Sequence, residues 1–181
     1  MNNQGTGTEK EPGMLTGLFT DKESSESAYK SLRDRGYSDD EINVLMSDDT
    51  RKKYYGDGTA NSELGTKATE GTGVGGAIGG TLGAIIAGIA AVGTNLVLPG
   101  LGLVVWGPLA AALAGAGAGG LTGGLVGMLI GAGIPEDRAA AYETGVKNGG
   151  TVFGVKPRNE EDASYLENDW KTNHRGVDVY R

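Results

Sequence analysis

A run of 65 consecutive residues without a charged side chain or a histidine, from Gly71 to Pro135, constrains the fold more than any other feature of this sequence. The run holds 21 of the 34 glycines. Small residues recur through it at a spacing of four, in two series: Gly71, Gly75, Gly79, Gly83, Ala87 and Ala91, then Ala111, Gly115, Gly119, Gly123, Gly127 and Gly131. Because residues i and i+4 share one face of an α-helix, each series predicts a stripe that a second helix can approach closely.

The two stripes predict a glycine-zipper α-helical hairpin over residues 71–134, with arms at roughly 72–94 and 108–134. The stretch from Asn95 to Pro108, the first residue of the second arm, contains two prolines and three glycines, which is a strong break in helical structure. Each arm also carries larger apolar side chains: Ile78, Leu82, Ile85, Ile86 and Ile89 on the first, and Leu109, Leu113, Leu121, Leu125, Met128 and Leu129 on the second.

Two environments fit such a hairpin. At about 1.5 Å per residue, each arm is long enough for a hydrocarbon core of about 30 Å, so the hairpin could insert in a membrane. Glycine, however, adds little hydrophobicity and costs about 1 kcal/mol per helical residue relative to alanine in water. The alternative is therefore a soluble hairpin that is buried, or that self-assembles so that its copies bury one another.

The composition excludes several other classes of protein. The chain has no cysteine, so it forms no disulfide and has no thiolate chemistry. Its formal net charge is −7 and no basic stripe is present, which argues against a nucleic-acid partner. The N-terminus lacks an apolar stretch, so we expect no signal peptide.

The residues before the hairpin predict a disordered tail, a folded half and a linker. Residues 1–13 are polar and lack periodicity. Residues 14–47 read as a strand, a helix and a strand, in which Asp21 caps the start of the helix and Gly36 ends it in a left-handed conformation. Residues 48–70 read as a polar linker.

The residues after the hairpin predict a helix and a second folded half over 135–181. The helix spans about 135–148, and a strand over 151–155 follows it. A second helix, capped by Asn159, then leads to a strand at Val177 to Tyr180. Two such halves predict an α+β, ferredoxin-like βαβ-βαβ sandwich, interrupted by the hairpin, in which the two strands of each half run parallel.

Three segments together resemble a known family. They are Gly17-Leu-Phe-Thr-Asp21 with Gly36-Tyr-Ser-Asp-Asp-Glu-Ile42, then Gly133-Ile-Pro-Glu-Asp137 with the glycines at 145, 149 and 150, and finally Gly176-Val-Asp-Val179. The combination is similar to bacterial general stress proteins of the heat-induced, 17M-like kind, and the similarity covers most of 14–181. The resemblance implies a bacterial, stress-associated protein without an established enzymatic activity, and it brings no catalytic residues.

The motifs that suggest a ligand are weak. Gly71 to Gly76 and Gly115 to Gly120 both spell G-x-G-x-x-G, but neither copy has the preceding strand and following acidic residue of a dinucleotide site. His174 is the only histidine, so a zinc site of the usual kind is not expected, and we interpret it as a surface residue near a helix end. We expect no cofactor and no metal.

Two charged patterns have both a structural and a functional interpretation. The acidic runs at 39–41 and 160–162 fall where helices or turns begin, and capping explains them. Arg51, Lys52, Lys53, Tyr54 and Tyr55 could lie at a lipid headgroup surface, with Trp106 as an anchor on the far side. They could equally be an ordinary linker and the tip of a soluble hairpin.

We therefore expect a non-enzymatic protein that forms a homo-oligomer, inserts in a membrane, or does both. The predicted contact residues are Gly75, Gly79, Gly83, Ala87, Gly115, Gly119, Gly123 and Gly127. If the hairpin spans a bacterial membrane, both polar segments lie on the cytoplasmic side; the alternative is a cytoplasmic assembly. A small-ligand-binding sensory module is the other interpretation of a ferredoxin-like domain, and an enzyme is the weakest.

Overall fold

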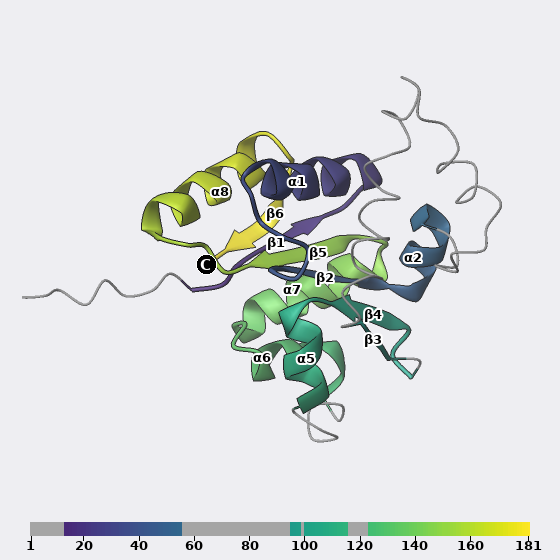
Figure 1. Ribbon diagram of the computed structural model, residues 1–181. Helices are drawn as coiled ribbons and strands as arrows, with labels where there is room; N and C mark the ends of the chain where they lie inside the picture. Colours follow the sequence, from purple (N-terminus) through teal and green to yellow (C-terminus); the bar gives the residue numbers. More distant parts are fainter. Residues whose placement is uncertain (1–12, 56–94, 99, 116–122) are drawn as a thin grey trace, which may run out of the picture.

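The computed structural model describes residues 13–55, 95–98, 100–115 and 123–181 (Figure 1). These residues form an α+β protein with one six-stranded antiparallel sheet and six helices. The strands are β1 (Leu15–Phe19), β2 (Ile42–Ser47), β3 (Asn95–Leu98), β4 (Leu103–Trp106), β5 (Thr151–Val155) and β6 (Val177–Tyr180). The helices are α1 (Lys22–Asp34), α2 (Asp48–Tyr55), α5 (Pro108–Gly115), α6 (Gly124–Gly131), α7 (Glu136–Lys147) and α8 (Glu160–Thr172).

The sheet has the strand order β3-β4-β2-β5-β1-β6. β5 is the strand that joins its two halves, since it pairs with β1 from Leu15↔Val155 to Phe19↔Thr151 and with β2 from Ile42↔Val155 to Met46↔Thr151. β1 and β2 are both antiparallel to β5, so they run parallel to each other, as predicted for the first half of the chain.

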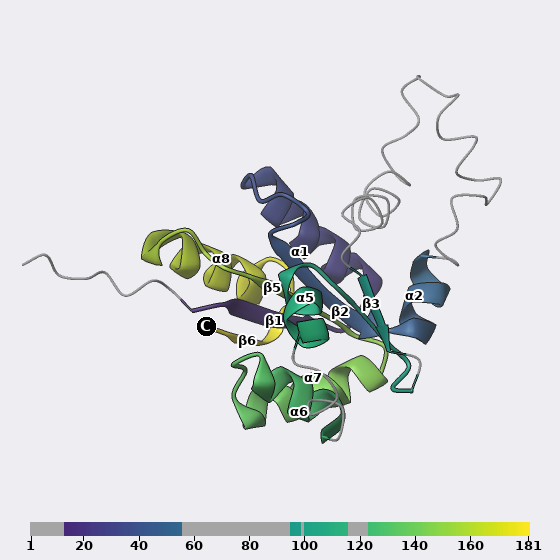
Figure 2. The ribbon, with the colours of Figure 1, turned by 60° about the horizontal axis from the view of Figure 1, so that its bottom comes forward.

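Helices cover both faces of the sheet. α1 and α8 lie on one side, here called the front face, and α5, α6 and α7 lie on the other, the back face (Figures 1 and 2). β1, β4 and β5 are consequently buried along their whole length. This explains why these strands are nearly continuous apolar runs rather than alternating ones.

Each face has its own core. On the front face, Phe19 and Phe153 pack with Trp170 of α8, and the Phe19 and Trp170 rings meet edge to face at 5.3 Å. Gly17 leaves room for the indole, because a Cβ there would lie 2.9 Å from Trp170 Cε3. On the back face, Leu18, Leu45 and Val105 pack against apolar side chains of α5, α6 and α7.

The local signals at both ends of the chain are confirmed. Asp21 caps α1 by accepting a hydrogen bond from the Ser24 amide at 2.8 Å, and Asn159 caps α8 through the Asp162 amide at 2.8 Å. Gly36 ends α1 with φ +90°, and the Tyr37 amide donates back to the Leu32 carbonyl at 3.0 Å. All four strands predicted outside the hairpin are present.

The polar linker prediction is wrong at its start, since residues 48–55 form helix α2. The physical reason is local: Asp48 lies in the first turn and accepts ion pairs from Arg51 and Lys52, both at 2.8 Å. Such i,i+3 and i,i+4 pairs favour a helix.

The prediction of one helix over 108–134 is also wrong. The break before it is a β-hairpin, β3 and β4, which extends the sheet beyond β2. Two separate helices follow, α5 and α6, and α6 begins at Gly124, where a φ of +64° interrupts the helical backbone. The first predicted arm, 72–94, the tail 1–12 and the rest of the linker lie outside the described residues.

Candidate functional site

Two of the predicted contact residues belong to helix α6: Gly127 lies within it and Gly123 directly precedes it. Its buried side is formed by Leu125, Met128 and Leu129, which pack on the back face of the sheet. Its glycines lie on the other sides: Gly127 is half-buried and Gly131 is exposed, as is Gly123 just before the helix. A Cβ added at Gly123 or Gly131 would meet no atom within 4 Å. The small-residue stripe of α6 is therefore turned away from the core of its own chain.

Helix α5 has a similar division. Leu109 and Ala110 are buried against the sheet, whereas Ala111, Ala112 and Ala114 are exposed. α5 and α6 lie on the same side of the sheet (Figure 1). We call the exposed small residues of these two helices the small-residue face; its members are Ala111, Ala112, Ala114, Gly123 and Gly131, with the half-buried Gly127.

The small-residue face has no charge of its own and a large apolar side chain beside it. No Asp, Glu, Lys, Arg or His occurs between 71 and 135, although the chain as a whole carries a net charge of −7. Ile130, on the outer side of α6, is 43% exposed. Gly75, Gly79, Gly83, Ala87 and Gly119 lie outside the described residues, and only the backbone of Gly115 is described.

The predicted membrane-interface residues lie on two elements, α2 and β4. Trp106 is buried in β4, 6% exposed, opposite Val44 of β2, so its indole is not available as an anchor. Arg51, Lys52, Lys53 and Tyr54 are on α2, where the Lys53 ammonium lies 5.1 Å from the centre of the Tyr54 ring. Within the part of the chain that the structure describes, no helix combines the length and apolar character that crossing a bilayer requires.

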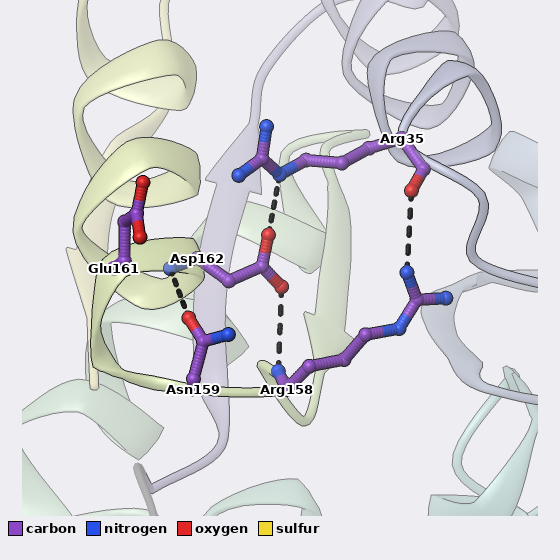
Figure 3. A pocket seen from close by; sticks show the side chains of 5 residues that line it. All are labelled: Arg35, Arg158, Asn159, Glu161 and Asp162. Carbon is purple, nitrogen blue, oxygen red and sulfur yellow. Dashed lines mark hydrogen bonds and ion pairs between the residues drawn. The ribbon is translucent and has the colours of Figure 1, made fainter.

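A polar pocket of about 370 Å³ lies where the end of α1 meets the start of α8 (Figure 3). Its lining residues are Arg35, Arg158, Asn159, Glu161 and Asp162. Asp162 is its buried centre: the carboxylate accepts hydrogen bonds from Arg35 Nε, from the Tyr37 hydroxyl and, at 3.3 Å, from the Arg158 amide. The sequence predicted only a capping role for the acidic run 160–162, and no local signal marks Asp162 as different from its neighbours.

The electrostatics of this pocket are balanced internally. Burial alone would raise the pKa of Asp162, but the hydrogen bonds from Tyr37, Arg35 and the Arg158 amide outweigh it and hold the pKa below its usual range. Burial and the bond to Asp162 raise the pKa of Tyr37 well above its ordinary value. Arg158 is also engaged, donating to the Arg35 carbonyl at 3.3 Å and the Gly36 carbonyl at 2.7 Å. The arrangement is suited to clamping α1 to α8 rather than to chemistry on a ligand.

His174 lies two residues after the end of α8, near a helix end as predicted, but its side chain is only 13% exposed and contacts both α1 and α8. Nδ1 lies 2.6 Å from Ser27 Oγ of α1, and Nε2 lies 3.0 Å from Asp169 Oδ2 of α8. Sequence reasoning missed this contact because Ser27 and His174 are separated by 147 positions. Among the described residues, no group of His, Cys, Asp and Glu is arranged to hold a metal ion.

Comparison of this chain with protein-family models, with curated proteins and with solved structures finds no match.

Proposed function

We propose that this chain is a non-enzymatic, bacterial stress-associated protein that self-associates through its small-residue stripes. The observation that carries the proposal is the orientation of α6: Leu125, Met128 and Leu129 face the sheet, whereas a Cβ added at Gly131 would meet open space and Gly127 is only half-buried. Helices pack closely where small residues let two backbones approach, and an outward stripe of this kind lacks such a partner within its own core. The stress association rests on the resemblance described above.

The strand order of the sheet is consistent with a folded core that acts as a rigid support for the small-residue face. The strand order β2-β5-β1-β6, with α1 and α8 on one face, is the order of a ferredoxin-like sandwich. We infer that this sandwich is extended by the β3–β4 hairpin and closed on its back face by α5, α6 and α7. The segment between β2 and β5 would then present the small-residue face from a rigid support.

A second copy of the chain is the favoured partner. Each copy carries a net charge of −7, so contact between copies is least unfavourable where no charge is present, and the small-residue face meets that condition. The predicted ladder in residues 71–94 offers a matching stripe, which would contribute Gly75, Gly79, Gly83 and Ala87 to the contact.

Substitution of Gly131 by a larger residue tests this proposal. Because a Cβ there meets open space, Gly131→Leu leaves the packing of the single chain intact and obstructs an approaching helix. We expect a lower molar mass by light scattering and less cross-linking than wild type, with Gly131→Ala close to wild type. Asn168→Leu, at an exposed position of α8, is the matched control for added bulk. An unchanged mass for Gly131→Leu and for the pair Gly79→Leu with Gly119→Leu would contradict the proposal.

Fractionation of the native protein separates the two environments. The described part of the second arm packs its apolar side on the sheet, which favours contact between protein surfaces over lipid. We therefore expect release by a carbonate wash. Protein that leaves the membrane fraction only with detergent would instead assign the self-association to a bilayer.

A second candidate function rests on one cavity. A space of about 750 Å³ opens beside Arg158, with Asp40 and Glu41 among its lining residues together with Lys156 and Arg158. Carboxylates and cations around one opening would suit a small zwitterion such as an amino acid. A thermal shift on titration with amino acids, lost in Glu41→Gln, would support this sensory module; no shift with any of them would remove it.

A further inference from the structure

A serine, a histidine and a buried aspartate form a hydrogen-bonded chain at the surface between α1 and α8. Ser27 is half-buried on α1, and its Oγ lies 2.6 Å from His174 Nδ1. His174 Nε2 lies 3.0 Å from Asp169 Oδ2, and Asp169 is only 6% exposed. One tautomer of the imidazole satisfies both contacts: the Ser27 hydroxyl donates to Nδ1, and the Nε2–H donates to the carboxylate.

The loop after α8 fixes the imidazole in this place. The Asn173 side chain donates to the other Asp169 oxygen at 2.8 Å, and the Gly176 amide donates to the Trp170 carbonyl at 2.7 Å. Arg175, directly after the histidine, has φ +53°, which is uncommon for a residue with a side chain. Unfavourable backbone of this kind persists only where the surroundings determine it, and it is concentrated at functional sites.

The chain has the geometry of an activated nucleophile. A serine hydroxyl becomes reactive when a base lies within hydrogen-bond reach and a third group orients that base. Here the base is His174 and the orienting group is Asp169. None of these three residues belongs to the small-residue face or lines the pocket around Asp162, so neither feature explains their arrangement.

We propose that Ser27 is a covalent acceptor for an activated acyl group, such as that of an acyl phosphate. Ser27 Oγ attacks the carbonyl carbon and forms the ester bond, the bond from that carbon to the phosphate oxygen breaks, and phosphate leaves. The hydroxyl proton passes to His174 Nδ1 and from there to solvent. Ser27 lies inside α1, where its amide is engaged by the helix and is not free to stabilise an oxyanion, so the product is a stable ester rather than a turnover intermediate.

A fluorophosphonate is the first probe, because it reacts with activated serines by forming an Oγ–P bond as the P–F bond breaks and fluoride leaves. We expect one adduct by intact mass on the full chain, mapped to Ser27 by peptide sequencing and absent in Ser27→Ala. His174→Gln should slow labelling by about 100-fold or more, since a positioned base contributes on that scale. Ser31 is the internal control, because it lies on the same helix and its hydroxyl donates to the Ala28 carbonyl instead.

Acetyl phosphate then tests the acyl chemistry itself. We expect an acetyl ester on the Ser27 hydroxyl in wild type and no acetyl ester on any hydroxyl of the same peptide in Ser27→Ala. The proposal is overturned if no adduct forms, if Ser31 is labelled as fast as Ser27, or if His174→Gln is labelled at the wild-type rate. The comparison of Ser27 with Ser31 is made within one wild-type molecule, so it holds even where a variant folds poorly.

Discussion

Substitution of Gly107 by alanine tests whether the uncharged segment is part of the folded core. Gly107 connects β4 to α5 with φ +86°, and a Cβ there would lie 2.3 Å from the Ile42 carbonyl oxygen and 3.1 Å from the Asn43 Cα. Both atoms belong to the backbone of β2, the neighbouring strand, so they cannot move aside without disturbing the sheet. In a hairpin detached from the sheet, the same glycine would be in an open turn.

The expected loss of stability has two parts. A left-handed conformation costs an alanine about 1–2 kcal/mol. Overpacking against fixed atoms costs about 1–3 kcal/mol more. We therefore expect Gly107→Ala to lower the free energy of unfolding by about 2–5 kcal/mol.

Two glycines in the β3–β4 turn are matched controls. Gly102 has φ +62° but its Cβ would meet no atom within 4 Å, so Gly102→Ala should cost only the backbone part, about 1–2 kcal/mol. Gly100 has open space and no positive φ, so Gly100→Ala should be close to neutral. Urea unfolding followed by fluorescence is suitable because both tryptophans, Trp106 and Trp170, are buried. A Gly107→Ala loss within about 0.5 kcal/mol of the Gly102→Ala loss would refute the packing of this segment on β2.

Three further substitutions probe the two cores. Asp162→Asn should cost about 1.5–3 kcal/mol at neutral pH, since the hydrogen bonds from Arg35 and Tyr37 then lose their charged acceptor. Because the folded pKa of Asp162 is lowered, this stabilisation is complete above about pH 4 and is lost as the pH falls further, so acid unfolding curves of wild type and variant should converge. Tyr142→Phe should cost about 1 kcal/mol, because the hydroxyl lies 2.7 Å from the Asp178 carbonyl oxygen. Burial raises the pKa of Tyr142 to about 12, so the folded state is favoured below about pH 10 and loses this advantage as the pH rises through 12. Because the pKa of Tyr37 is raised as well, the phenylalanine variant should show a smaller alkaline loss of stability than wild type rather than none. Gly145→Ala should destabilise the protein by about 1 kcal/mol although alanine has the better helix propensity, since the new Cβ would lie 2.2 Å from Leu18 Cδ2. In a Leu18→Ala background, where this clash is removed, thermal unfolding should show that Gly145→Ala stabilises the protein. Destabilisation in that background as well would contradict the contact.

The ends of the chain could be predicted from sequence because their signals are local. Asp21, Gly36 and Asn159 each fix a helix boundary through atoms within four or five residues. The strands that follow them are short apolar runs bounded by such caps. Local capping and periodicity were therefore enough for the order of these elements.

The segment from Asn95 to Gly131 could not be predicted in the same way. Leucine and valine at 95–98 and 103–106 are compatible with the middle of an apolar helical hairpin and with two strands. The choice is made by β2, more than 50 positions away, which pairs with β4. The interruption at Gly124 could not be predicted from sequence either. Glycines at a spacing of four are compatible with a continuous helix and also with a positive φ at one of them.

The contacts around Asp162 and His174 could not be predicted either, because they also join residues that are far apart in the sequence. Arg35 and Asp162 are 127 positions apart, and Ser27 and His174 are 147 apart. One sequence contains no pairing information at such distances. Both contacts exist because α1 and α8 lie side by side on the front face of the sheet (Figure 1).

The central position of β5 has a consequence for how the chain is made. β1 and β2 each pair with β5, and the partners Ile42 and Val155 are 113 positions apart. A ribosome therefore releases the first two strands, the uncharged segment and α7 before the strand that joins them exists. Until residue 155 has emerged, β1 and β2 keep apolar, unpaired edges, which are prone to aggregation. Closing so long a loop is also slow, so the nascent protein should depend on chaperones most in the interval just before β5 appears.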